Sequence, residues 1–250
     1  MSVAGAAMDA DAARTEDAAS PPAAAHGPVR RALSAVAWRL LWMAGGPRAV
    51  FTRVYRRNVW GNAESVSGAG STARRGEAFR ADLIDLLRRL DTRVLLDAPC
   101  GDFNWIGEVA DAVPRYVGVD VVPELIERVR AAHGSARRTF IRADLARDPL
   151  PRADVILCRD GLVHFSFAEI RDALRNFKRS GAEYLLTTTF VDTARNVDIR
   201  TGGGWRDLNL REPPFSFPPP LELIDERCTD YGGRYRGKRL GLWRLDALPG

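Results

Sequence analysis

The chain alternates short apolar runs with amphipathic stretches from Arg93 onward, and this alternation restricts its fold more than any other feature. The apolar runs have the length of buried strands, and the stretches between them have the length of helices. Strands separated by helices run parallel in one sheet, joined by right-handed crossovers. The predicted strands are Val94–Asp97, Tyr116–Asp120, Thr139–Ala143, Val155–Cys158 and Tyr184–Phe190, followed by two closing strands at Leu221–Glu226 and Arg239–Leu245. The fold class is therefore α/β, with a seven-stranded, mostly parallel sheet.

Four helices are predicted around these strands. They are expected at Glu77–Leu90, Trp105–Val113, Pro123–His133 and Phe167–Lys178. After Phe190 the alternation stops, and residues 191–220 are rich in glycine and proline. A loop of this length is unusual in a compact domain unless it covers a site, so we expect a lid or substrate-binding insertion there.

Composition divides the chain into three parts. Residues 1–28 are rich in alanine and proline and have almost no large apolar side chain, which predicts a disordered tail. Residues 29–76 join two short helices, broken at Gly45-Gly46-Pro47, to a serine- and glycine-rich loop. Residues 77–250 hold the α/β domain, which is long enough to bury a sizeable core.

The net charge of +5 is concentrated in one short segment. Residues 29–60 carry seven arginines and no acid, whereas the α/β domain is close to neutral. A nucleic-acid-binding domain usually has a basic patch on its own body, so we do not expect a nucleic-acid partner. The basic segment has two interpretations, either cap helices with arginines facing solvent or a peripheral contact with an anionic membrane or a protein.

The cysteines and the apolar runs indicate where the protein works. Cys100, Cys158 and Cys228 are widely spaced and odd in number, which is typical of a reduced, intracellular protein. The chain has no apolar run of eighteen residues, so no transmembrane segment is expected. We therefore predict a cytoplasmic location.

The most informative local motif is the turn that follows the first predicted strand. It runs from Val94 through Asp97 and Gly101 to Trp105, from an apolar run through a Pro/Gly turn into a helical pattern. Parallel α/β sheets bind nucleotide-like cofactors at such junctions, where unpaired backbone N–H groups open the helix. This turn is the expected ligand site.

Four fragments in order resemble the motifs of class I S-adenosylmethionine-dependent methyltransferases, which have a Rossmann-like fold. They are Asp97-Ala98-Pro99-Cys100-Gly101-Asp102-Phe103, Tyr116-Val117-Gly118-Val119-Asp120, Ile141-Arg142-Ala143-Asp144-Leu145, and Asp154-Val155-Ile156-Leu157-Cys158-Arg159-Asp160. The spacing from Asp97 to Asp120 suits one βαβ step and an acid at a ribose. The loop from Trp60 to Ser71 resembles segments of a poorly characterised bacterial branch of this superfamily, and it is expected to fold over the cofactor.

The resemblance implies S-adenosylmethionine (SAM) as the cofactor and a set of residues that hold it. In such enzymes the second acid accepts hydrogen bonds from the ribose and the third meets the adenine amino group. Carried onto this chain, the cofactor-binding residues are Asp97, Pro99, Cys100, Gly101, Asp102, Phe103, Asp120, Val121, Asp144, Leu145, Cys158 and Arg159.

Two residues of the first motif depart from the pattern of the superfamily. Pro99 and Phe103 stand where glycines are usual. Proline fixes φ and stiffens the turn. The phenyl ring of Phe103 is expected to line the pocket, where it would either stack on the cofactor or obstruct it, and the second outcome would leave a protein without activity.

His164 and Asp160 are the candidate catalytic residues, because both follow the fourth strand where an acceptor should face the methyl group. Imidazole is the side chain that titrates near neutral pH. A helix-bracing role for His164 and a capping role for Asp160 are the structural alternatives. Trp205 and Arg206, in the 191–220 insertion, are the candidate substrate-binding residues, with Arg206 suited to a carboxylate or phosphate. The cysteines have no metal-ligand spacing, and no metal is expected.

The sequence therefore predicts a SAM-dependent methyltransferase that acts on a small-molecule or glycan-like acceptor. A protein or RNA acceptor is one alternative, and a non-catalytic SAM-binding regulatory protein is another. Neither the acceptor atom nor the oligomeric state follows from the sequence.

Overall fold

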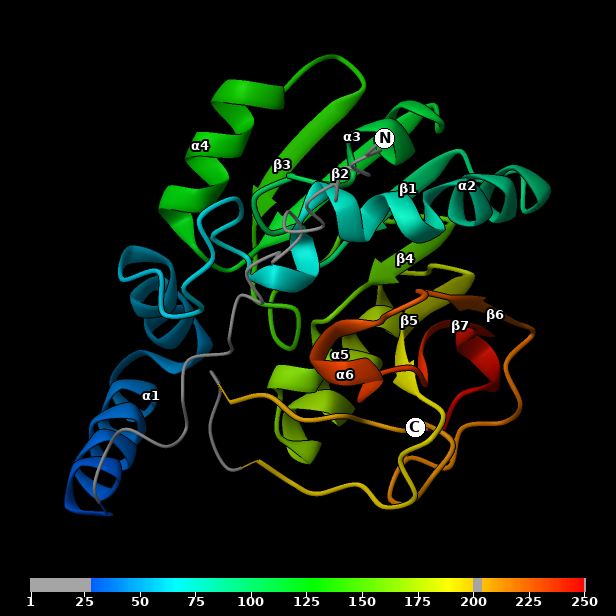
Figure 1. The fold of residues 1–250 in the computed structure, drawn as a ribbon. Coiled ribbons are helices and arrows are strands. Elements are labelled where there is room, and N and C mark those ends of the chain that lie inside the picture. The colour runs from blue at the N-terminus through cyan, green and yellow to red at the C-terminus, as the bar shows by residue number, and fades with distance from the viewer. Residues whose placement is uncertain (1–27, 200–203, 250) are drawn as a thin grey trace, which may run out of the picture.

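The computed structural model describes residues 28–199 and 204–249 and has a seven-stranded sheet at its centre (Figure 1). Its order is β3-β2-β1-β4-β5-β7-β6. The strands are β1 (Val94–Asp97), β2 (Arg115–Asp120), β3 (Arg138–Arg142), β4 (Val155–Cys158), β5 (Tyr184–Phe190), β6 (Glu222–Asp225) and β7 (Lys238–Arg244). The predicted strands therefore all exist, and half of their ends are shifted by one residue.

The first five strands are parallel, and β7 lies antiparallel between β5 and β6. The order reverses at β1, which pairs with β2 on one side and β4 on the other. Ligands of open α/β sheets bind outside the carboxyl ends of the strands at such a switch point. The predicted fold class, α/β with a mostly parallel sheet and an N-terminal helical extension, is confirmed.

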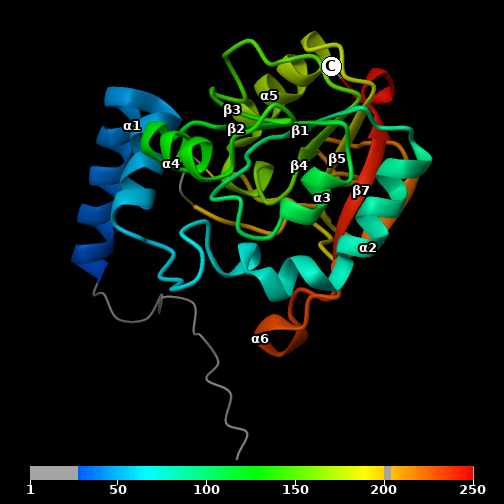
Figure 2. The same cartoon turned by 90° about the horizontal axis from the view of Figure 1, so that it is seen from above.

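Side chains of neighbouring strand residues enter two separate cores, one on each face of the sheet. Leu95 packs with α2 (Ala73–Arg89), α3 (Gly107–Asp111) and α4 (Pro123–His133), while Leu96 packs with α5 (Phe167–Arg179). Figure 2 shows α2 and α3 on one side of the sheet and α5 on the other. This layering follows from the two-residue period of a strand between faces that are both covered.

Helix α2 begins at Ala73, four residues before the predicted start. The Ala73 N–H donates to Glu64 Oε1 at 2.7 Å, so a carboxylate of the preceding loop satisfies a free donor of the first turn. Helix α3 is shorter than predicted, because Trp105 and Ile106 belong to the turn before it. The remaining elements include two 3₁₀ turns, Ala69–Ser71 and Leu162–His164, and the short α6 (Asp230–Gly233).

Helix α1 (Pro28–Arg56) is kinked at the predicted break. Gly46 has φ 58° and ψ −152°, and Pro47 follows it, so the helix changes direction there. Val50 and Val54 are buried, while Arg48 and Arg53 face solvent. This arrangement corresponds to the cap-helix interpretation, and Figures 1 and 2 both show α1 flanking α4. The contact with a membrane or protein stays a prediction, and the predicted tail falls outside the described residues.

The described part of residues 191–220 forms neither helix nor strand, yet it is firmly packed. Leu208, Leu210, Phe215 and Phe217 join the core on the α5 side. The buried Asn196 amide donates to three backbone carbonyls of the same segment, at 2.8–3.2 Å. Finally, none of the described helices has the length and hydropathy needed to cross a membrane.

Candidate cofactor and active site

A cavity of about 990 Å³, part of it open to solvent, lies at the carboxyl ends of β1, β2 and β4. It collects most of the residues that the sequence analysis selected. Those on its wall are Asp97, Pro99, Cys100, Gly101, Asp120, Val121, Asp144, Leu145, Arg159, Asp160 and His164.

The N-terminal extension supplies the other wall. Sequence analysis missed the contribution of α1, which lines the cavity with Pro47, Phe51, Val54 and Tyr55. Trp60, Val66, Ser67 and Ser71 come from the serine- and glycine-rich loop, so this loop lines the site as expected. The apolar stripe on α1 was the available signal, but it does not tell which surface the helix covers.

Hydrogen bonds to the Asp102 carboxylate connect the turn after β1 to the serine- and glycine-rich loop. Asp102 accepts hydrogen bonds from Ser65 Oγ at 3.1 Å and from the Val66 N–H at 3.0 Å. The Asp102 N–H in turn donates to Ser67 Oγ at 3.0 Å. Asp102 is thus a positioning group behind the cavity, and its side chain does not line the wall.

The sequence analysis was wrong about where the ring of Phe103 lies. Phe103 is buried and packs against Tyr116, His133 and Phe140, with ring centroids 4.7–5.4 Å apart. Its backbone has φ 62°, the left-handed conformation that a glycine would adopt at no cost. Because this conformation turns the ring into the core, Phe103 neither stacks in the cavity nor obstructs it.

Two buried carboxylates stand at the ends of β1 and β2. Asp97 accepts a 2.6 Å hydrogen bond from the Tyr116 hydroxyl, and burial raises the pKa of Asp97 to about 7. Burial also raises the pKa of Asp120 to about 6, although the N–H groups of Val122 and Gly101 donate to it at 3.0 and 3.3 Å. Carboxylates with raised pKa values in a cleft are typical of functional sites.

Asp144 and Leu145 follow β3 and face the cavity beside Val121. Asp144 Oδ1 accepts from the Ala146 N–H at 2.9 Å, and Oδ2 pairs with Arg147 at 3.0 Å. Each oxygen keeps acceptor capacity, because an ionised carboxylate has about four lone-pair sites.

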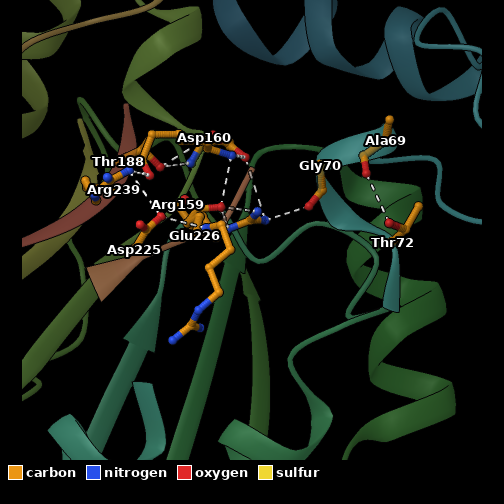
Figure 3. A network of polar contacts seen from close by, with 11 residues as sticks. Ala69, Gly70, Thr72, Arg159, Asp160, Thr188, Asp225, Glu226 and Arg239 are labelled. Atoms are coloured by element: carbon orange, nitrogen blue, oxygen red, sulfur yellow. Dashed lines mark hydrogen bonds and ion pairs between the residues drawn. The ribbon is translucent and has the colours of Figure 1, made fainter. Parts of the chain in front are cut away.

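Arg159 and Asp160, which both line the cavity, belong to a largely buried network of ion pairs (Figure 3). Arg159 donates to Glu226 Oε2 at 2.5 and 3.0 Å and to the Gly70 carbonyl at 2.8 Å. Lys238 bridges Asp160 and Glu226 at 2.6 and 3.1 Å. Sequence analysis missed Glu226 and Lys238, which lie near the chain end and reach the site only through the antiparallel placement of β7.

These partners decide the protonation of Asp160. Burial favours the neutral acid, but Lys238 and Arg159 outweigh it and lower the pKa of Asp160 to about 2. A carboxylate with so low a pKa is a poor proton acceptor near neutral pH. Asp160 is therefore an electrostatic anchor for the network. Cys158 lies fully buried beneath it and outside the cavity wall, and burial raises the pKa of its thiol to about 12.

His164 stands at the end of the Leu162–His164 turn and faces the cavity. Its Nδ1 lies 2.5 Å from the Gly204 carbonyl oxygen. A carbonyl can only accept, so Nδ1 carries the proton and Nε2 of the neutral ring keeps a lone pair. Burial lowers the pKa of His164, which keeps the ring neutral at pH 7. Trp60 stacks on it with a centroid separation of 5.3 Å.

The two predicted substrate-binding residues lie outside the cavity wall. Trp205 packs edge-on against Phe190 and Tyr235, with centroids 5.7 and 5.0 Å away, which pins the insertion to the domain. Arg206 is buried, and its guanidinium donates to backbone carbonyls. The expected recognition of an anion by Arg206 has no support in this geometry.

The cavity fits the adenosine part of a cofactor and offers no metal centre. Asp120 uses its two oxygens for single backbone donors, which leaves lone pairs for a diol. Val121, Val122, Leu125 and Leu145 give an apolar slot of the kind that takes a flat ring. Among the described residues, no group of three His, Cys, Asp or Glu side chains is placed to hold a metal ion.

Comparisons with known proteins agree with this fold. Residues 95–182 match the family model described as "Methyltransferase domain". The chain resembles the structure of human N-acetylserotonin methyltransferase in complex with SAM, with 13% identity, 82% of this chain and 57% of that chain covered, and a TM-score of 0.50. No curated protein matches the chain.

Two bacterial structures are also similar. Magnesium protoporphyrin IX methyltransferase from Synechocystis PCC 6803, solved with bound S-adenosyl-L-homocysteine (SAH), has 15% identity, coverage of 84% of this chain and 98% of that chain, and a TM-score of 0.48. The N-methyltransferase NodS from Bradyrhizobium japonicum WM9, in complex with SAH, has 16% identity, coverage of 55% and 73%, and a TM-score of 0.42. The match to the methyltransferase family model spans β1 to α5, and residues from all four sequence motifs line one cavity.

Proposed function

We propose that this protein transfers the methyl group of SAM to a hydroxyl or similar proton-bearing group of a small-molecule or glycan-like acceptor, and that His164 accepts the proton. The observation that carries the proposal is the Nδ1 contact with the Gly204 carbonyl. It leaves Nε2 as the acceptor atom of a ring that lines the same cavity as Gly101 and Asp120. A base within hydrogen-bond reach of an acceptor contributes about 10²–10⁴ in rate.

The cofactor would be held by residues that the sequence motifs share with the superfamily. Asp120 is suited to the ribose hydroxyls, Asp144 to the adenine amino group, and the backbone at Gly101 to the amino-acid end. When bound, SAM supplies an electrophilic methyl group on a positively charged sulfur. The protein's own part is to orient donor and acceptor, exclude water and take up the proton.

The charges around the cavity favour a neutral acceptor. Among the described wall residues, the one guanidinium is Arg159, and it is already engaged with Glu226 and Gly70. Four wall residues, Asp97, Asp120, Asp144 and Asp160, are acids. A phosphate or carboxylate would therefore find no uncommitted guanidinium among the described wall residues. A hydroxylated metabolite fits better than an RNA strand.

We further propose roles for the parts of the chain outside the sheet. Residues 29–76 would close the cofactor side of the cavity, since α1 and the loop already form its wall. Residues 191–220 would cover the acceptor side, because their 204–206 stretch contacts the turn that carries His164. A cytoplasmic location is supported by three free, buried cysteines.

The first test is binding, measured by calorimetry with SAM and SAH. Wild type is expected to bind both, and Asp120→Ala to lose at least tenfold in affinity because it removes both acceptor oxygens at the ribose. Asp172→Ala is the control, since Asp172 is an acid of α5 that pairs with Arg175 outside the cavity wall. Absence of binding by wild type would refute the proposal.

The second test is transfer of a labelled methyl group from SAM to a metabolite extract. Wild type is expected to label a low-mass compound. His164→Ala is expected to keep SAM affinity and lower turnover by about 10²–10⁴, because the proton loses its acceptor. His133→Ala is the control, a histidine outside the wall. Label in the protein or RNA fraction instead would favour the macromolecular acceptor, and binding without transfer would favour a regulatory protein.

A further inference from the structure

The Leu162–His164 turn is held by hydrogen bonds from one buried side chain, that of Arg206. The Leu162, Val163 and Phe165 carbonyls all accept from the Arg206 guanidinium, at 3.0, 2.6 and 2.6 Å. The Arg206 N–H also donates to the Val163 carbonyl at 3.3 Å. A turn of only three residues has few hydrogen bonds of its own, so these contacts fix the direction in which it presents its last side chain.

The same short stretch of chain also holds the imidazole. Gly204, two residues before Arg206, provides the carbonyl that accepts from His164 Nδ1. Residues 204–206 therefore contact both the backbone of the turn and the ring at its end. Four of the five guanidinium N–H groups of Arg206 are used, counting the 3.2 Å bond to the Val197 carbonyl, which leaves too few for bidentate binding of an anion.

We propose that Arg206 is a positioning residue, which holds His164 in the Nδ1–H form with Nε2 directed into the cavity. The inference rests on the proposed role of His164, but it concerns the state of the ring itself. Arg206 acts through the 162–165 backbone and through the placement of the Gly204 carbonyl. It thus takes a role different from the anion recognition that its sequence context suggested.

The charge of Arg206 acts in the same direction as its hydrogen bonds. The pKa of His164 is lowered first by burial and also by the positive charges of Arg206 and Lys238, whereas the Gly204 carbonyl and Asp160 oppose this shift. Phe51 and Trp60, which pack on the other side of the ring, are uncharged. Loss of the positive charge at position 206 should therefore raise the pKa of His164, and a lysine there should largely preserve it.

The experiment is nitrogen NMR of ¹⁵N-histidine-labelled protein, in which His164 is one of three histidines. Wild type should show His164 in a single Nδ1–H form at pH 7.5. Arg206→Gln should give a mixture with the Nε2–H form and a higher pKa of His164. Arg206→Lys keeps the positive charge but loses the hydrogen bonds to the three carbonyls. It should therefore give a mixture of the two His164 tautomers, with a pKa of His164 near that of wild type. Arg137→Gln is the matched control, because Arg137 also donates to three carbonyls, of Asp111, Val113 and Pro114, away from the cavity.

A readout of function accompanies the NMR signals. The rate of transfer of the labelled methyl group from SAM to the metabolite extract should fall at least tenfold in Arg206→Gln, with SAM affinity unchanged. An unaltered His164 tautomer in both Arg206 variants would overturn the inference. If Arg206→Gln does not fold, Arg206→Lys alone decides the outcome from its tautomer ratio. Failure of the proposed function would be seen separately, as a correctly positioned His164 in a protein that transfers no methyl group.

Discussion

Burial brings the pKa values of Asp97 and Asp120 close to neutral pH. Both stand at strand ends with little solvent contact, so the ionised form loses its hydration, and their pKa values rise to about 7 and about 6. Asp160, which follows β4, has a partly buried side chain, and Lys238 and Arg159 lower its pKa to about 2 although burial acts in the opposite direction. The difference comes mainly from these two cations.

This difference predicts how SAM binding depends on pH. The ionised carboxylate of Asp120 is the better acceptor for ribose hydroxyls, so affinity should fall as the pH is lowered through about 6. Calorimetry between pH 5 and pH 8 should show SAM affinity decreasing by several-fold toward the acid end. Asp120→Asn, which cannot titrate, should bind weakly with a flatter profile. Affinity independent of pH in wild type would contradict the role of Asp120.

At the scale of elements, the turn after β1 and the serine- and glycine-rich loop form one unit. Gly101 has φ 54°, and a Cβ atom there would lie 2.4 Å from Ser67 Oγ. The Gly101 position therefore requires both a left-handed backbone and empty space. Gly101→Ala should lower the free energy of unfolding by about 1–3 kcal/mol and displace the loop from the cavity.

A second substitution separates the two causes. Ser67→Gly removes the clashing hydroxyl, so the double variant should recover part of the stability lost by Gly101→Ala, leaving the cost of the backbone conformation. Urea unfolding of the two single variants and the double variant measures this coupling. Strict additivity of the two changes would show that the contact between loop and turn has no energetic effect.

The elements also show which features could be predicted from the sequence. Strand existence and order follow from apolar runs and acids at strand ends, which are local signals. The cavity wall formed by Phe51 and Tyr55 could not be predicted in this way. An amphipathic pattern shows that a helix packs against the protein, but it does not show which surface the helix covers. The position of the Phe103 ring depends on the positive φ of this residue, and a phenylalanine in the sequence gives no indication of such a backbone conformation. The roles of Lys238 and Arg206 depend on segments distant in sequence, and such contacts leave no periodicity.

In the whole molecule, one buried ion-pair network joins the ends of β4 and β7 to the N-terminal loop. Arg159 from the end of β4 binds the Gly70 carbonyl of the loop and Glu226 after β6, and Lys238 opens β7. Glu226 is 3% exposed, and its Oε1 has no hydrogen-bond partner among the described residues. Loss of a cation from the network would therefore leave a buried carboxylate without a compensating charge.

Lys238→Met tests this dependence. The variant leaves two buried carboxylates with Arg159 as their one remaining cation, and removal of one partner from a buried pair typically costs about 3–5 kcal/mol. Urea unfolding should show a loss of this size, and the pKa of Asp160 should rise. Arg244→Met, which removes the exposed pairs with Glu183 and Asp246, is the control and should leave the free energy of unfolding nearly unchanged. Equal effects of the two substitutions would contradict the structural role of the network.

A crystal structure of the complex with SAH would show whether one cavity both binds SAM and presents His164 to the acceptor. We expect the ribose hydroxyls on Asp120, the adenine against Val121 and Leu145, and the sulfur on the side of the cavity where His164 directs Nε2. A ligand bound elsewhere, or a sulfur separated from His164 by the protein wall, would contradict this expectation.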